Sequence, residues 1–251
     1  MVSLSEPKPI VEIPSGLASP VAKHALRASQ LFDAGRTAEA VKEYDAALDL
    51  LPTDPDLLNN RAIAHAWLGN LEAATRDFES ALGMAPHDSN LHMNYAIALL
   101  KLGFAERALA HLNEAVSVAD GKNQLAATLS NRGLALAQLE RIEESIADFR
   151  AALECAPESL TARLNLAAAL ARSRKHKEAV AAIDRAWEIA RNDEDRQSLA
   201  DLRQQIVEAS LRKLVRRGIV SWSGDRPKGS DPPVPITPGP PVSDYVIEDR
   251  G

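Results

Sequence analysis

Residues 55–88 read PDLLNNRAIAHAWLGNLEAATRDFESALGMAPHD, and this stretch decides the fold. Its apolar residues recur three and four positions apart, which places them on one face of an α-helix. The small side chain of Ala62 and the large ring of Phe78 fall in two such helical segments. Gly69 separates the segments, because glycine readily takes the left-handed conformation that ends a helix. Pro86 then ends the second helix, so the stretch predicts a pair of short helices.

The same residue types recur along the chain at a spacing of 34 residues, as from Ala28 to Ala62, with one slip of three residues near 121–124. Four columns carry the repeat: a small residue (Ala28, Ala62, Ala96, Gly133, Ala167), a second small residue (Ala40, Ala74, Ala108, Ser145, Ala179), a large apolar residue (Tyr44, Phe78, Leu112, Phe149, Ile183) and an alanine (Ala47, Ala81, Ala115, Ala152, Ala186). A fixed period of this length indicates stacked, self-similar structural units.

These columns resemble the tetratricopeptide repeat (TPR) family, whose signature has a small residue in the first helix, then A-x3-F and a closing proline. The resemblance implies an all-α fold, a right-handed α-solenoid of about five helix pairs with a C-terminal capping helix and disordered termini. It predicts repeats at 21–54, 55–88, 89–122, 126–159 and 160–193.

Two columns depart from the family pattern. Glu140 and Arg174 stand where the glycine between paired helices is expected. Arginine replaces the usual leucine of the first helix in three repeats, at Arg27, Arg61 and Arg132. The last repeats are therefore the ones that match the family least.

The flanking segments differ from the repeats in composition. Residues 1–20 have no helical pattern and predict a disordered arm. Residues 194–217 predict a capping helix, since Leu199 and Ile206 share one apolar face. Residues 218–251 contain DPPVPITPGPP at 231–241, which excludes helix and predicts a disordered, proline-rich tail.

Composition and charge exclude several classes of function. The net charge of −6 includes no long basic run, so nothing predicts nucleic-acid binding. Cys155 is the only cysteine, which excludes an intramolecular disulfide. The sequence has neither a signal peptide at its start nor an apolar run long enough for a membrane span. These features predict a cytoplasmic protein that binds no membrane.

No catalytic constellation is evident among the residues. The chain has no glycine-rich phosphate loop and no H-E-x-x-H pair. We interpret His87 and His92 as ordinary polar residues of a loop, His65 as a partly buried packing residue, and Cys155 as a packing residue rather than a nucleophile. The sequence therefore predicts a protein that is not an enzyme and has no cofactor and no metal site.

A column of asparagines suggests how a partner binds. Asn60, Asn94, Asn131 and Asn165 fall at one repeat position in the first helices, which line the concave face in TPR arrays. A side-chain amide offers a donor and an acceptor, and so can pair with any peptide backbone. The alternative is that these amides tie each helix to the neighbouring repeat.

Four hydrogen-bonding side chains at about 0.5–1.5 kcal/mol each do not offset an association cost of about 4–15 kcal/mol. We therefore expect other groove residues to contribute, with Trp67 as an anchor. The predicted set is Asn59, Ile63, Trp67, Asn90, Met93, Ile97, Lys101, Ser130, Gln138 and Arg172.

The tail gives an alternative function. Residues 217–250 resemble the toxin-binding segment of bacterial antitoxins of the prevent-host-death class, which implies that the tail folds onto a small toxin enzyme and neutralises it. The matching and exposed apolar residues are Trp222, Pro227, Val242, Ser243, Tyr245, Val246, Ile247, Glu248, Asp249 and Arg250. A plain disordered terminus, or a tail that occupies the chain's own groove, is the other interpretation.

Overall fold

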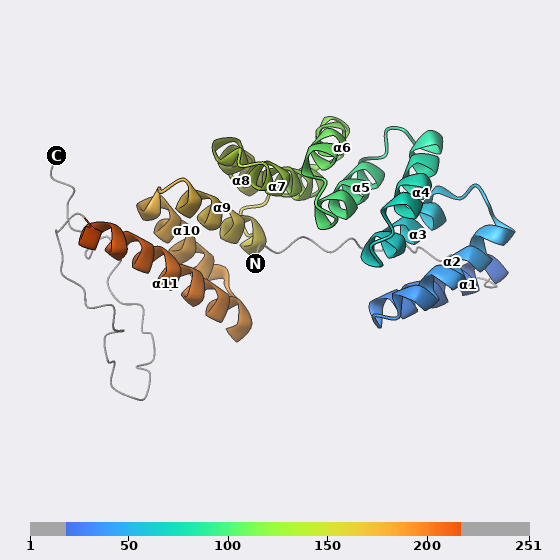
Figure 1. The fold of residues 1–251 in the computed structure, drawn as a ribbon, viewed down its shortest axis with the longest axis horizontal. Coiled ribbons are helices and arrows are strands. Elements are labelled where there is room, and N and C mark those ends of the chain that lie inside the picture. Colours follow the sequence, from blue (N-terminus) through green and yellow to red (C-terminus); the bar gives the residue numbers. More distant parts are fainter. Residues whose placement is uncertain (1–18, 217–251) are drawn as a thin grey trace. The chain divides into compact units, whose positions relative to one another are not determined.

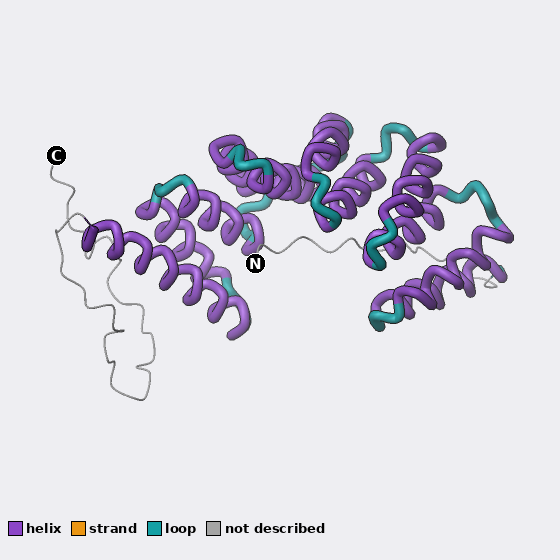
Figure 2. Tube along the Cα trace, in the orientation of Figure 1, coloured by secondary structure: helices purple, strands orange, loops and turns teal. Residues whose placement is uncertain are grey.

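The computed structural model describes residues 19–216, and apart from short turns and loops this range is helical (Figures 1 and 2). No β-strand occurs within it. The helices are α1 (Pro20–Asp33), α2 (Thr37–Leu50), α3 (Pro55–Trp67), α4 (Leu71–Met84), α5 (Ser89–Lys101), α6 (Ala105–Ser117), α7 (Lys122–Gln138), α8 (Ile142–Cys155), α9 (Leu160–Arg172), α10 (His176–Ile189) and α11 (Asp193–Arg216). The predicted all-α fold of paired helices is confirmed.

The chain divides into two compact units at Pro157. The first unit holds four helix pairs, α1–α2, α3–α4, α5–α6 and α7–α8, and the two members of each pair pack on one another. The second unit holds the pair α9–α10, on which α11 packs. We call the first member of each pair its A helix and the second its B helix.

Four of the five A helices follow a side chain that accepts a hydrogen bond from a backbone amide of the first turn, whereas α7 follows Gly121, which has none. Asp54 accepts a hydrogen bond from the backbone N–H of Leu57 at 2.9 Å, and Pro55 occupies the first helical position. Asp88 does the same for α5, since its carboxylate accepts hydrogen bonds of 2.7 and 3.1 Å from the backbone N–H groups of Asn90 and Leu91. A capping side chain and a proline at the first position both favour a helix start.

The turn between paired helices requires a left-handed residue in every repeat. Gly35, Gly69 and Gly103 have φ values of 74°, 81° and 86°. Glu140 and Arg174, which replace glycine in the last two repeats, have φ values of 59° and 61°. The substituted repeats therefore keep the glycine geometry, and their side chains accept a conformation that non-glycine residues rarely adopt.

The positive φ of non-glycine residues at this turn can be tested by two opposite substitutions. Glu140→Gly should raise the free energy of unfolding by up to about 1 kcal/mol, because glycine adopts positive φ without a Cβ clash. Gly103→Ala should lower it by about 1 kcal/mol. A Cβ on Gly103 would meet no atom within 4 Å. Any loss of stability in Gly103→Ala therefore comes from the positive φ of the backbone and not from a steric clash with neighbouring residues. Urea unfolding of the full chain measures both, and equal stability of Glu140→Gly and the parent would contradict the explanation.

The core of the first unit lies between the A and B helix of each pair, where small residues face large ones. Phe78 and Phe149 on B helices are 0% and 1% exposed. A Cβ added to Gly133 on α7 would lie only 2.7 Å from the ring of Phe149, so this position needs glycine's lack of a side chain. The Phe78 ring also stacks on Tyr95 of the next pair at 4.7 Å between centroids, which links successive repeats.

In the second unit, α11 buries Leu199 and Ile206. Across residues 20–216, no helix is both long and apolar enough to cross a membrane. The predicted N-terminal arm, except for its last two residues, and the tail with its antitoxin-like segment lie outside the described residues.

Candidate functional site

The predicted groove residues separate into an interior set and an accessible set. The interior set is below 9% exposed and consists of Asn59, Asn60, Ile63, Asn94, Ile97, Ser130 and Asn131 in the first unit and Asn165 in the second. All four members of the asparagine column belong to it. Within the described residues these amides therefore do not form the expected ladder open to a partner, because neighbouring residues cover their side chains.

Three asparagines form a short hydrogen-bonded chain across two repeats. The amide of Asn94 on α5 donates to Asn59 on α3 at 3.1 Å, and the amide of Asn59 donates to Asn60 at 3.1 Å. Asn59 is 0% exposed, so these bonds form away from water. The geometry at Asn94 matches the alternative interpretation, in which the amide ties an A helix to the neighbouring repeat.

Asn131 occupies the same column but lacks such a tie. It is 1% exposed, and neither its amide nitrogen nor its amide oxygen has a hydrogen-bond partner within the described residues. The position that holds Asn59 in the preceding junction holds Met93 here. A thioether is a weak acceptor and no donor, and the Met93 sulfur already takes a contact from the Thr128 hydroxyl at 3.7 Å.

Because Asn94 has a hydrogen-bond partner and Asn131 has none among the described residues, replacing each with alanine should lower the free energy of unfolding by different amounts. Asn94→Ala and Asn131→Ala remove the same side chain at the same repeat position. Asn94→Ala should destabilise the chain more, by about 1 kcal/mol, because only Asn94 loses a hydrogen bond and leaves Asn59 with an unpaired oxygen. Thermal unfolding of the two variants makes the comparison, and an equal loss would mean that the tie contributes nothing.

The accessible set can contact a partner directly. Lys101 and Gln138 are exposed, and Trp67, Asn90 and Met93 are partly exposed. Asn90 accepts a hydrogen bond from the Gln124 side chain of the next A helix at 2.9 Å. In the second unit Arg172 is exposed. Trp67, Lys101, Gln138 and Arg172 are the last residues of their A helices.

An aromatic cluster forms at the ends of α1, α3 and α5. The Trp67 ring meets the Phe32 ring edge-on, with centroids 5.9 Å apart. The ammonium of Lys101 lies 4.6 Å from the centroid of the Trp67 ring, which is a cation–π contact. Beside them, Phe32, Tyr44, Asn60 and Ile63 line a shallow surface hollow. The cluster thus places the rings of Phe32 and Trp67 beside the positive charge of Lys101, next to a shallow hollow.

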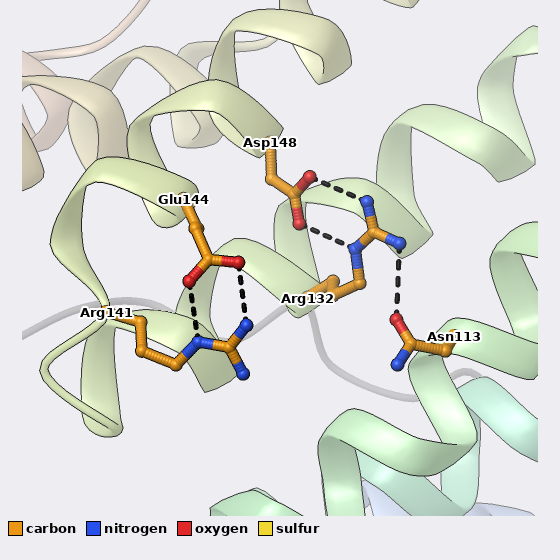
Figure 3. A network of polar contacts seen from close by, with 5 residues as sticks. All are labelled: Asn113, Arg132, Arg141, Glu144 and Asp148. Atoms are coloured by element: carbon orange, nitrogen blue, oxygen red, sulfur yellow. Dashed lines mark hydrogen bonds and ion pairs between the residues drawn. The ribbon is translucent and has the colours of Figure 1, made fainter.

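A column of charged pairs, which the sequence analysis missed, lies between the A and B helices. Arg132 on α7 donates two hydrogen bonds of 2.7 Å to Asp148 on α8, and a third of 3.3 Å to Asn113 on α6 (Figure 3). Arg61 donates two hydrogen bonds to Asp77, at 2.7 and 2.8 Å, and one of 2.8 Å to Asp45 of the preceding repeat. The hydrogen bonds to these carboxylates raise the pKa of both arginines.

The three arginines noted as departures each pair with an acid sixteen residues later: Arg27 with Glu43, Arg61 with Asp77 and Arg132 with Asp148. That fixed offset was the signal available in the sequence. In the third repeat, Tyr95 and His111 occupy the two positions and stack at 4.3 Å instead. The charged pairs are structural, since they join an A helix to its own B helix.

Figure 3 also supplies a control for the strength of these pairs. Arg141 binds Glu144 with the same forked geometry, at 2.7 and 2.6 Å, but on the surface. Asp148→Ala should cost about 1.5–3 kcal/mol of unfolding free energy, because it leaves the Arg132 guanidinium without its main partner away from bulk water. Glu144→Ala should leave the melting temperature unchanged, since water solvates both partners. Calorimetry measures the unfolding of both variants. A small effect of Asp148→Ala would show that the paired hydrogen bonds between Arg132 and Asp148 are dispensable for stability.

His92 and His111 form a partly buried pair. His92 lies within α5, not in a loop, and its Nε2–H donates to the Pro86 carbonyl at 3.0 Å. Its Nδ1 is thereby left to accept from Nδ1 of His111 at 3.2 Å. Burial, followed by the neighbouring His92 and Arg107, lowers the pKa of His111 to about 4. Among the described residues, no three histidine, cysteine or acidic side chains converge on a metal-sized site.

Three sequence-family profiles match successive stretches of the chain. Residues 28–69 match a profile described as TPR repeat, and residues 68–131 and 130–194 match two described as tetratricopeptide repeat. Together the matches run without a gap from 28 to 194, across both units. Among curated protein sequences, none matches this chain.

Solved structures of other proteins share the fold. PilF of Pseudomonas aeruginosa has a TM-score of 0.61 at 18% identity, over 80% of this chain and 93% of that one. A thermophilic TPR protein of Thermus thermophilus has a TM-score of 0.59 at 25% identity, over 76% and 99%. YrrB, described as a TPR protein with an unusual peptide-binding site, has a TM-score of 0.55 at 22% identity, over 72% and 90%.

Proposed function

Because the chain belongs to the tetratricopeptide repeat family, we propose that it is a non-enzymatic scaffold that binds an extended segment of another protein along its A helices. The observation that carries the proposal is the aromatic cluster of Phe32, Trp67 and Lys101. Large rings that remain partly open on a surface bring much of the binding energy of protein interfaces. YrrB, which has a similar fold, is itself described as having a peptide-binding site.

Trp67 is the anchor in this proposal. Its ring is held from two sides, by the Phe32 edge and by the Lys101 ammonium, so little side-chain entropy is lost when a partner packs on it. A partner's apolar side chain packs on the open part of this ring, because the hollow beside it has no room for a side chain. Asn90, Met93 and Gln138 extend the contact surface along α5 and α7 with neutral groups, which suit a partner's backbone.

The buried asparagines have an indirect role in the proposal. Asn59 and Asn94 hold α3 and α5 in register, and this register sets the spacing of the groups that face the partner. The antitoxin-like alternative depends on residues outside the described range, and it stays a hypothesis from the sequence alone.

Selection of a peptide library tests the function. The full chain is immobilised and offered phage that display random linear peptides, and the enriched peptides are then titrated as free molecules. Trp67→Ala should weaken their binding at least about tenfold, because a central tryptophan is a typical hot spot. Phe104→Ala is the matched control, since Phe104 is an aromatic exposed at 39% outside the cluster.

Circular dichroism of the Trp67→Ala variant separates lost binding from lost folding. A folded variant that binds the selected peptides as tightly as the parent would refute the groove proposal. Failure to enrich any peptide over empty phage would do so as well.

A further inference from the structure

The last residues of the first three A helices form a charge-polarised row. Asp33 ends α1, Trp67 ends α3 and Lys101 ends α5, and the three positions are equivalent because they lie 34 residues apart. Asp33 and Lys101 are exposed, and Trp67 is partly exposed. The row therefore presents a carboxylate, a ring and an ammonium in successive repeats.

The fold does not need the charge of Asp33. A carboxylate at a helix C-terminus faces the negative end of the helix dipole, which is unfavourable, and the last turn of α1 has no basic residue to offset it. In the described part of the chain Asp33 forms no ion pair. Lys101 has no carboxylate partner among the residues that the structure describes, and its ammonium rests on the Trp67 ring.

The apolar contact lies beside these two charges. The hollow is lined by Phe32, the chain neighbour of Asp33, and by Ile63, one turn before Trp67. Burial and then the nearby Asp33 carboxylate raise the pKa of Tyr44, another residue of the hollow. The negative charge is thus close to one side of the hollow, while Trp67 carries the positive charge of Lys101 on its ring.

We propose that this row selects a partner segment of mixed charge, in which a basic side chain meets Asp33, an apolar side chain packs at Trp67 and an acidic side chain meets Lys101. The inference rests on the proposed function and specifies its ligand. The Lys101 ammonium and the Phe32 ring lie 4.6 and 5.9 Å from the Trp67 ring. An extended chain advances about 3.3 Å per residue and its side chains alternate between two faces, so neighbouring side chains on one face, about two residues apart, match this spacing. The segment therefore carries its base, apolar residue and acid about two positions apart.

Three synthetic peptides with blocked ends test the row directly. Each has a central leucine with a charged residue about two positions away on either side and serine or threonine elsewhere. The mixed peptide carries one arginine and one glutamate, the basic peptide two arginines and the acidic peptide two glutamates. Both chain directions are available to the mixed peptide, so the test depends on charge composition and not on order.

The full-length parent should bind the mixed peptide about fivefold more tightly than either other peptide, as measured by fluorescence anisotropy of labelled peptides. The modest factor reflects exposed charge pairs, and it should shrink in high salt. Asp33→Lys should shift the preference to the acidic peptide, and Lys101→Glu should shift it to the basic peptide. Asp49→Lys, an exposed charge change on α2, is the matched control and should leave the preference as in the parent.

The outcomes separate this inference from the general proposal. If Trp67→Ala abolishes binding of library peptides while the two charge variants leave the peptide preference unchanged, the scaffold function stands and the mixed-charge row is refuted. If the parent binds all three peptides equally, or none of them, the row is refuted too. A switch of preference by Asp49→Lys would assign the effect to overall charge and would overturn it.

Discussion

Close approach of the two helices in each pair is the constraint on which the other features depend. A large apolar side chain of the B helix fills the gap, and a small residue of the A helix makes room for it. The contact between Phe149 and Gly133 shows how little space is left, since one added carbon would overlap the ring. Interiors packed at this density tolerate little change in volume, so the small and large columns have to alternate in every repeat.

Hydrogen bonds and ion pairs between helices add to the apolar packing and fix how neighbouring helices lie against one another. Arg61 joins its own B helix to that of the preceding repeat through Asp77 and Asp45. Asn59 and Asn94 join successive A helices. Buried polar groups with full sets of partners favour one arrangement of the helices over its alternatives. In this chain Asn59 and Asn94 form these contacts, although the sequence pattern alone predicted that they bind a ligand.

What is left for binding is concentrated at the helix ends. The A-helix interiors bury most of their residues, whereas the last residue of α1, α3 and α5 remains accessible. A repeat fold by itself says little about function, because one architecture carries many different surfaces. In the proposal made here, specificity comes from Asp33, Trp67 and Lys101, residues that the repeat signature leaves free to vary.

The sequence by itself determined the fold, because helical periodicity and a 34-residue repeat of small and large residues, with one slip of three, are local patterns that can be read along the chain. It also located the turn positions, including Glu140, which takes the left-handed conformation that its column requires. Only the tertiary structure decided which polar residues are accessible. Asn94 and Lys101 both lie on α5, yet one is 4% exposed and tied to Asn59 while the other is open to solvent. The reason is that exposure depends on how neighbouring repeats pack, and that packing is set by side chains distant in the sequence.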